Sequence, residues 1–262
     1  MATSLSPNNL SSPQVFEFSQ SDRTIGLSIR KRTGGPERSL VLQFLETLSE
    51  FVEIGEQRIA IFHEPRVEHS FPDLVLSVFK PSCFEEWNEY RRHLSVQDLK
   101  VLHFFHRTGP IELVSAARQL GLNERVLHRH IQSLGCANLI HATSSNIWEV
   151  VELSQAFAIS RLIAIEAKVS DGKTALEQAA RNLWFASESY TLMPRAYLSD
   201  HTLTRYESTG VGAIACDLDG IEELISSNVL EVPSTYASWL FNEWIGRALL
   251  ANRESEHSYA FS

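Results

Sequence analysis

The chain has 262 residues, 44% hydrophobic and 21% charged, a composition typical of a soluble globular protein. It has no apolar run close to the roughly 20 residues that a membrane-spanning helix needs. Residues 1–13 lack the basic start and apolar core of a signal peptide. The three cysteines are far apart and have no metal or redox spacing, so we expect free thiols in a cytoplasmic protein.

Charge is unevenly distributed along the chain. The net charge of −9 argues against a general binder of polyanions. Residues 91–151, however, hold seven Lys or Arg, four Asp or Glu and six of the ten histidines, which gives this segment a net charge of +3. The pattern indicates a basic module carried on an acidic body.

The first third of the chain is predicted to contain short strands, one helix and a hairpin. Residues 1–35 read as an N-terminal segment that is partly flexible and ends in a basic turn. Apolar residues at helical spacing predict the helix, and Pro36 fits its first turn. The expected elements are strands at residues 15–18, 25–29, 58–63 and 73–79 and a helix at residues 37–52.

The middle of the chain has the pattern of three helices followed by a hairpin. Ser95, Gly121 and Asn123 are typical of helix ends. The run Ala116 to Asn123 strongly resembles the core of a winged helix-turn-helix domain, with Gly121 at the sharp turn. The expected elements are helices at residues 95–106, 111–120 and 124–134 and strands at residues 139–141 and 147–151.

The last part of the chain alternates helices and strands, so that the whole sequence predicts an α/β fold, a mixed sheet flanked by helices. A polar, flexible tail is expected at residues 251–262. The expected elements are helices at residues 152–160, 173–186, 196–206 and 235–250 and strands at residues 162–169, 190–193 and 211–216.

The strand at residues 162–169 carries an unusual pair of charges. Apolar residues lead into Glu166 and Lys168, and residues i and i+2 of a strand point to the same face. Charges are rarely buried unless they are paired or hold a metal, so the pair indicates a site. The alternative is an exposed ion pair on a half-solvated sheet, which contributes about 0–1 kcal/mol and carries no function.

The order of the elements and two short motifs resemble the PD-(D/E)XK nuclease superfamily. The motifs are Pro72-Asp73 and Glu166-Ala167-Lys168, on strands in the matching order. Gln178 matches a glutamine often found in the helix after the lysine strand, and Glu37 matches a glutamate at the start of the first helix of some members. The resemblance covers roughly residues 34–80 and 161–216, and it implies a restriction-endonuclease-like fold.

The resemblance implies metal-dependent hydrolysis of phosphodiester bonds. Asp73, Glu166 and the backbone carbonyl of Ala167 would hold Mg²⁺ or Mn²⁺, since Mg²⁺ prefers oxygen ligands. Lys168 would orient or help deprotonate the attacking water and stabilise negative charge. Gln178 would position the nucleophile or a phosphate. Glu37 is a further catalytic candidate, with an ordinary first-turn glutamate as the alternative.

One departure from the family pattern concerns the spacing of the two motifs. Asp73 and Glu166 are 93 positions apart, whereas a compact nuclease joins these strands by a short turn. We therefore expect a discontinuous nuclease-like domain, residues 36–90 and 152–250, with a winged helix-turn-helix domain inserted at residues 91–151. The pairing of the two strands is left open. Glu64 and Glu68 could approach the metal, but solvated loop charges are the simpler interpretation.

The third helix of the inserted segment carries the candidate DNA-binding residues. A recognition helix reads the major groove with its N-terminal residues, and the wing contacts the DNA backbone. The alternative is a winged helix that contacts protein. The candidates are Asn123, Arg125, His128, Arg129, Gln132, Ser144 and Ser145.

The sequence thus predicts a Mg²⁺-dependent or Mn²⁺-dependent endonuclease that locates double-stranded DNA through its winged helix. Two alternatives stay open: a catalytically inactive nuclease-fold regulator that binds DNA, and a subunit of a larger defence or transposition complex. A homodimer would suit cleavage of both strands, but the sequence does not establish one.

Overall fold

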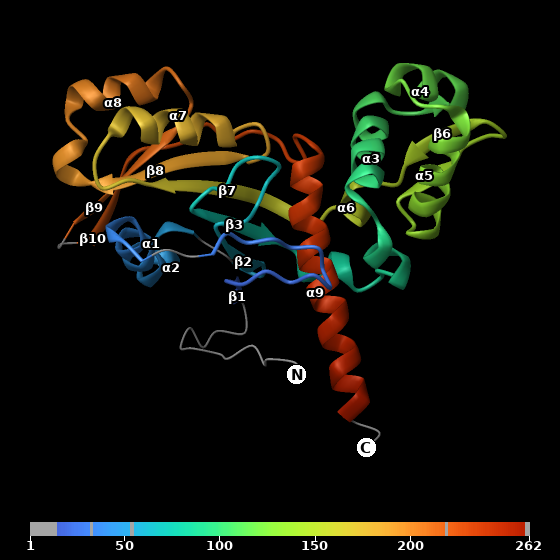
Figure 1. The fold of residues 1–262 in the computed structure, drawn as a ribbon, viewed down its shortest axis with the longest axis horizontal. Helices are drawn as coiled ribbons and strands as arrows, with labels where there is room; N and C mark the ends of the chain where they lie inside the picture. Colours follow the sequence, from blue (N-terminus) through green and yellow to red (C-terminus); the bar gives the residue numbers. More distant parts are fainter. Residues whose placement is uncertain (1–14, 32–33, 53–54, 218–219, 260–262) are drawn as a thin grey trace.

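The structure is a computed structural model, and it describes residues 15–31, 34–52, 55–217 and 220–259. Its centre is a seven-stranded mixed sheet with the strand order β1-β2-β3-β7-β8-β9-β10 (Figure 1). The predicted α/β class, a mixed sheet flanked by helices, is confirmed. The strands are β1 (Val15–Phe18), β2 (Arg58–His63), β3 (Leu74–Phe79), β7 (Ile159–Ala167), β8 (Glu188–Pro194), β9 (Gly212–Asp217) and β10 (Gly220–Ile225).

The strand pairings bring distant parts of the chain together. β2 and β3 form an antiparallel hairpin, and β3 also pairs antiparallel with β7. β7, β8 and β9 run parallel to one another. The pairing that the sequence left open is therefore β3 with β7, and its register places Leu74 opposite Ile165.

Helices cover both faces of the sheet. Successive side chains of a strand point to opposite faces, and both faces are buried here, which explains why the central strands are almost continuously apolar. In Figure 1, α7 and α8 lie above the sheet and α1 and α2 below it, while α9 packs on the face of α7. These helices are α1 (Pro36–Glu46), α2 (Leu48–Phe51), α7 (Gly172–Asn182), α8 (Asp200–Glu207) and α9 (Tyr236–Tyr259).

The segment between β3 and β7 lies beyond one end of the sheet (Figure 1). Its residues 95–151, here called the helical module, include three helices and a small sheet of order β4-β6-β5. Ser95 caps the first helix in a reciprocal capping box with Asp98. The elements of the whole segment between β3 and β7 are η1 (Pro81–Phe84), η2 (Glu89–His93), α3 (Val96–Thr108), β4 (Ile111–Glu112), α4 (Leu113–Leu120), α5 (Glu124–Cys136), β5 (Ile140–Ala142), β6 (Ile147–Val150) and α6 (Leu153–Ala156).

Helix α9 joins the helical module to the sheet. Its Trp239, Phe241 and Trp244 belong to one continuous buried core that also contains residues of β2, β3, α3 and α5. The module and the sheet are therefore packed against a shared helix and are not linked by chain alone.

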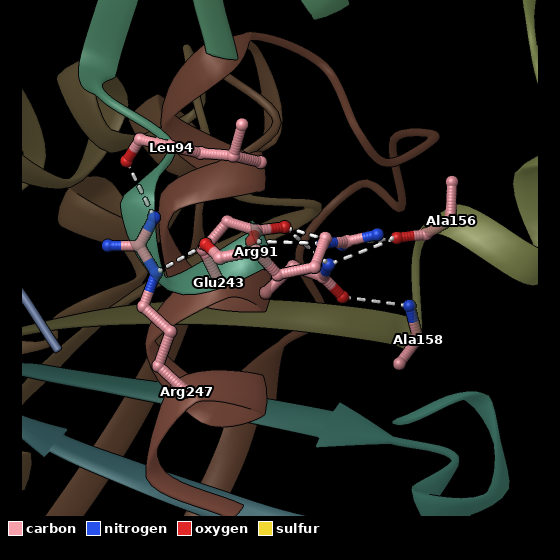
Figure 2. A network of polar contacts seen from close by, with 7 residues as sticks. Arg91, Leu94, Ala156, Ala158, Glu243 and Arg247 are labelled. Atoms are coloured by element: carbon pink, nitrogen blue, oxygen red, sulfur yellow. Dashed lines mark hydrogen bonds and ion pairs between the residues drawn. The ribbon is translucent and has the colours of Figure 1, made fainter. Parts of the chain in front are cut away.

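A buried polar cluster fixes this junction. Arg91 donates hydrogen bonds of 2.6 and 3.2 Å to the two carboxylate oxygens of Glu243 (Figure 2). Arg247 donates to the carbonyl oxygens of Arg91, Leu94 and Ile25. Asn242 Nδ2 donates to the Ala156 carbonyl, and its Oδ1 accepts from the Ala158 N–H. We call Arg91, Asn242, Glu243 and Arg247 the junction network.

Several predicted boundaries in the first half are wrong. Residues 25–29 make isolated bridges, not a regular strand. The helix predicted at residues 111–120 starts at Leu113, because Ile111 and Glu112 pair with β6. The helix predicted to stop at Gly135 continues to Cys136. The N-terminal residues 1–14 and part of the basic turn, residues 32–33, lie outside the described residues.

Boundaries in the second half differ for similar reasons. The helix predicted at residues 152–160 is limited to α6, because β7 already starts at Ile159. Strand β10 was not predicted; its Glu222 and Glu223 are exposed at the edge of the sheet. Helix α9 runs to Tyr259, past the predicted end at residue 250, and residues 260–262 lie outside the described part. None of the described helices combines the length and apolarity needed to cross a bilayer.

Candidate active site

Asp73 and Glu166 meet at one end of the sheet. Asp73 immediately precedes β3, and the antiparallel register that pairs Leu74 with Ile165 puts Glu166 beside it. Asp73 Oδ2 accepts a hydrogen bond of 2.9 Å from the backbone N–H of Ala167. Two carboxylates far apart in sequence therefore lie on neighbouring strands.

Burial gives these carboxylates unusual electrostatics. Glu166 is 6% exposed, and its Oε1 accepts a hydrogen bond of 2.8 Å from Asn182 Nδ2. Burial, and then the charge of Asp73, raise the pKa of Glu166 to about 8. Burial also raises the pKa of Asp73. A second negative charge on the pair is therefore unfavourable unless a cation compensates it.

Lys168 brings one cation to the pair. It directly follows β7, and its backbone N–H donates to the carbonyl oxygen of Leu192 at 3.0 Å. Its Nζ donates to Glu37 Oε1 at 3.0 Å, in the first turn of α1. Because Asn182 comes from α7 on the opposite face of the sheet, the site draws on both helical layers.

Arg30 brings a second cation, from the segment before α1. Its Nε is 2.5 Å from Glu64 Oε2, and its Nη2 is 3.8 Å from Asp73 Oδ1. The interpretation of Glu64 as a solvated loop charge is wrong, because its side chain is 17% exposed and ion-paired. Glu68 is 42% exposed and contacts Lys100 at 3.8 Å, away from the carboxylate pair.

A hollow of about 80 Å³ opens beside the carboxylates. It lies between the start of α1 and the loop after β2, and Glu37, Glu64 and Asp73 line it together with His63. His63 is buried and its Nε2 lies 2.6 Å from Glu17 Oε1. Solvent-accessible space therefore reaches Asp73 directly, whereas Glu166 lies deeper in the fold.

The structure brings four predicted catalytic residues together, namely Asp73, Glu166, Lys168 and Glu37. Gln178 is placed differently: its Oε1 is buried without a hydrogen-bond partner among the described residues. Asn182, four residues later on α7, binds Glu166 instead. Asn182 was not predicted from the sequence. Because residues i and i+4 of a helix share a face, its spacing from Gln178 is the signal that would have indicated it.

The carboxylate oxygens of Asp73 and Glu166 suit a hard cation such as Mg²⁺. No cluster of three or more His, Cys, Asp or Glu with metal-binding geometry occurs in the part of the chain that the structure describes. Mg²⁺, however, is commonly held by one or two carboxylates with waters completing its shell. The two mutually repelling carboxylates, Asp73 and Glu166, fit that requirement, because a divalent ion would compensate their buried charge.

The candidate DNA-binding residues lie on the outside of the helical module. Arg125, Arg129 and the other candidates on α5 are exposed, while Leu127 and Ile131 of the same helix are buried. Asn123 has a structural task as well, because its Oδ1 caps α5 by accepting a hydrogen bond from the Arg125 N–H. Ser144 and Ser145 are exposed in the turn between β5 and β6.

Comparisons with known proteins add no relative to this picture. No protein-family model, no curated protein and no solved structure matched the chain. The case for a function therefore depends on the residues and their geometry.

Proposed function

We propose that the protein is a metal-dependent deoxyribonuclease with its active site at Asp73, Glu166 and Lys168. The observation that carries the proposal is the buried pair Asp73 and Glu166 on adjacent strands, with Lys168 directly after the second strand. Phosphodiester hydrolysis needs a cation beside the scissile phosphate and a group that handles the attacking water. This end of the sheet offers residues for both tasks.

The order and pairing of the elements support the resemblance to the PD-(D/E)XK superfamily. Helix α1 is followed by β2, β3 and β7, which pair antiparallel in turn, and then by α7 and the parallel strand β8. In this proposal the fold is restriction-endonuclease-like and the helical module is an inserted winged helix-turn-helix domain, with three helices and a small antiparallel sheet.

Asp73, Glu166 and the carbonyl of Ala167 would hold Mg²⁺ or Mn²⁺, which supplies Lewis-acid stabilisation of the phosphate. Lys168 would hold a water for attack and offset negative charge on the phosphate. Glu37 positions the Lys168 ammonium, which it contacts at 3.0 Å. Gln178, with an unpartnered buried oxygen, is the weakest member of the predicted set.

The exposed face of α5 would locate the substrate. Arg125 and Arg129 carry fixed charges on a segment that is basic relative to the rest of the chain. Such residues contact phosphates and base edges when a recognition helix lies in the major groove. Double-stranded DNA is therefore the proposed substrate, and a cytoplasmic setting stays a prediction from composition.

The test is cleavage of supercoiled plasmid and oligonucleotide duplexes with Mg²⁺ or Mn²⁺. Lys168→Met and Asp73→Asn are expected to lower the rate by at least about 10²–10³-fold, because each removes a charge that acts on the reacting phosphate. Glu177→Gln is the matched control, since Glu177 lies on α7 beside Gln178 but is exposed. Mn²⁺ binding, followed by calorimetry, should weaken in Asp73→Asn and not in the control.

A different function would be favoured by other outcomes. The oxygens of the carboxylate pair already accept bonds from Ala167 and Asn182, and Lys168 is already paired, as expected of a nuclease fold without activity. If the protein binds DNA but neither cleaves it nor binds Mn²⁺, such a regulator is favoured. Intact Mn²⁺ binding without cleavage would favour a subunit that requires partners of a larger complex.

A further inference from the structure

Arg30 is the one charged side chain of the N-terminal segment, among the described residues, that is brought to the carboxylate pair. The backbone fixes its place: Arg30 N–H donates to the Glu64 carbonyl at 3.1 Å, and Arg66 N–H donates to the Ser28 carbonyl at 2.8 Å. Glu64 N–H in turn donates to the Asp73 carbonyl at 3.1 Å. Arg30, Glu64 and Asp73 therefore lie on three adjacent, hydrogen-bonded segments.

The Arg30 side chain is also oriented. Its Nε donates to Glu64 Oε2, and the guanidinium lies over the Phe71 ring with its Cζ 5.5 Å from the ring centroid. These contacts hold the planar group on two sides, and an arginine restrained in this way loses less entropy when it binds a ligand. The remaining Nη2 is directed towards Asp73 Oδ1 at 3.8 Å, beyond hydrogen-bond distance.

The exposure of Arg30 separates it from an ordinary structural ion pair. Its side chain is 52% exposed, while that of Glu64 is only 17% exposed. The Glu64 carboxylate is therefore largely buried against Arg30, whereas half of the Arg30 side chain remains open to solvent. A guanidinium has five N–H donors in a fixed fork that matches a phosphate. Only Nε is used in a hydrogen bond within the described residues, which leaves the Nη donors unused, with Nη2 3.8 Å from Asp73, a residue that lines the hollow.

We propose that Arg30 binds a phosphate of the nucleic-acid backbone next to the carboxylate pair, and that Glu64 is the positioning residue that orients its guanidinium. The inference rests on the proposed nuclease function and names a substrate contact for it. A polyanion approaching this hollow meets the carboxylates of Glu37, Glu64 and Asp73. A cation that binds phosphate beside them offsets this repulsion, and the Arg30 side chain, 52% exposed, is more open to such a ligand than that of Lys168, which is 19% exposed.

The experiment compares Arg30→Ala, Arg30→Lys and Glu64→Gln with the wild type and with Arg66→Ala. Arg66 is the matched control: it is exposed on the loop after β2, which pairs with the Arg30 segment, and its Nε donates to the Glu68 carbonyl, so its removal changes the charge equally without touching the site. Each variant is assayed for duplex cleavage with Mg²⁺ and for duplex binding in EDTA as a function of salt. Thermal unfolding checks that each variant folds.

Arg30→Ala is expected to lower kcat about 100-fold, with a smaller change in KM, because charge at the phosphate increases in the transition state. The slope of log Kobs against log salt should fall by about one, as for the loss of one phosphate contact. Arg30→Lys should recover part of the rate. Glu64→Gln should lower kcat only when Arg30 is present, so that the double variant Arg30→Ala/Glu64→Gln is no slower than Arg30→Ala.

The outcomes separate the inference from the function on which it rests. If the wild type cleaves and Arg30→Ala matches Arg66→Ala in kcat and in salt slope, the inference is overturned and the nuclease function stands. If the effects of Arg30→Ala and Glu64→Gln simply add, the positioning role of Glu64 is overturned. If the wild type cleaves no substrate with either metal, the nuclease function is overturned, and an unchanged salt slope in EDTA then overturns phosphate binding by Arg30 as well.

Discussion

Two regions of this protein bury charged side chains. In one region opposite charges are paired, and in the other two carboxylates lie side by side. In the junction network, Arg91 makes a bidentate pair with Glu243, and the Arg247 guanidinium donates to the backbone carbonyls of Arg91 and Leu94 (Figure 2). Arg247 also donates to the carbonyl of Ile25, so three carbonyl oxygens offset its extra positive charge. At the sheet end, Asp73 and Glu166 are neighbouring like charges whose pKa values are raised.

The difference separates a structural task from a chemical one. A buried network that satisfies its members stabilises one arrangement of the elements it joins. A buried pair of carboxylates without full compensation costs folding free energy, and such groups concentrate where a ligand or a reaction supplies the missing charge. On this argument the junction network holds the helical module against the sheet, and the sheet end is the place where a cation and a phosphate would bind.

The largest expected effect comes from breaking the junction network. Glu243→Ala and Arg91→Ala should each lower the free energy of unfolding by about 3–5 kcal/mol, because each leaves one buried charge without its partner. The measurement is urea denaturation of the metal-free protein.

The matched control removes both charges at once. Arg91→Met/Glu243→Leu should lie closer to the wild type than either single variant, since neither Arg91 nor Glu243 is left without its partner and the net buried charge is unchanged. The Ala156 carbonyl, which Arg91 also binds, keeps its hydrogen bond from Asn242 Nδ2. A loss below about 1 kcal/mol in the single variants would contradict the structural task assigned to this network.

The carboxylate pair should show the opposite response to losing a charge. Because the pKa of Glu166 is raised from 4.5 to about 8, its contribution to stability is fully present below pH 4.5 and is lost as pH rises towards about 8. Glu166→Gln cannot ionise and keeps an oxygen for Asn182. In EDTA at about pH 9 it should exceed the wild type in unfolding free energy by a few kcal/mol, although it loses cleavage.

Urea denaturation at about pH 5 and about pH 9 checks this prediction, with Glu177→Gln as the control for loss of an exposed carboxylate. The wild type and the control should both lose stability between the two pH values, while Glu166→Gln does not. Equal pH dependence in all three proteins would show that Glu166 is not a strained buried acid, and would remove the contrast with the junction network.

Much of the sheet was predictable because its signals are local. Runs of apolar residues bounded by polar turns gave β2, β3, β7, β8 and β9 close to their observed limits. Pro72 and Asp73 at the mouth of one strand, and Glu166 near the end of another, then suggested a meeting of carboxylates that the β3–β7 register provides. The pattern predicted which residues would meet because strand ends align in a sheet.

The rest of the site depends on contacts that leave no local signal. Arg30 reaches Asp73 only because segment 28–30 pairs with the loop after β2, and Glu64 turned from an expected solvated charge into a paired one for the same reason. Gln178 and Asn182 lie one helical turn apart on α7, and only the packing of α7 on β7 determines that Asn182 is the one that binds Glu166. Strand β10 was missed because its alternation is weak and its charges suit an exposed edge.

The smallest expected effect comes from adding a single methyl group next to the junction network, away from the carboxylate pair. Gly246 of α9 packs against Trp87, and a Cβ at this position would lie 2.0 Å from Trp87 Cζ3. Trp87 in turn lies under the Arg91 guanidinium, with the Arg91 Cζ 3.6 Å from the ring centroid. Gly246→Ala should therefore displace Trp87 from Arg91 and cost about 1–3 kcal/mol in the unfolding free energy.

The same substitution at Gly135, inside α5, serves as the control, because a Cβ there meets only the Ile140 carbonyl oxygen at 3.9 Å. Alanine has the higher helix propensity, so Gly135→Ala should stabilise the protein by up to about 1 kcal/mol. Neither change touches the carboxylate pair, and Mn²⁺ binding should be the same in both variants. Loss of Mn²⁺ binding in Gly246→Ala alone would mean that the junction also shapes the sheet end, and that the two regions are coupled through α9.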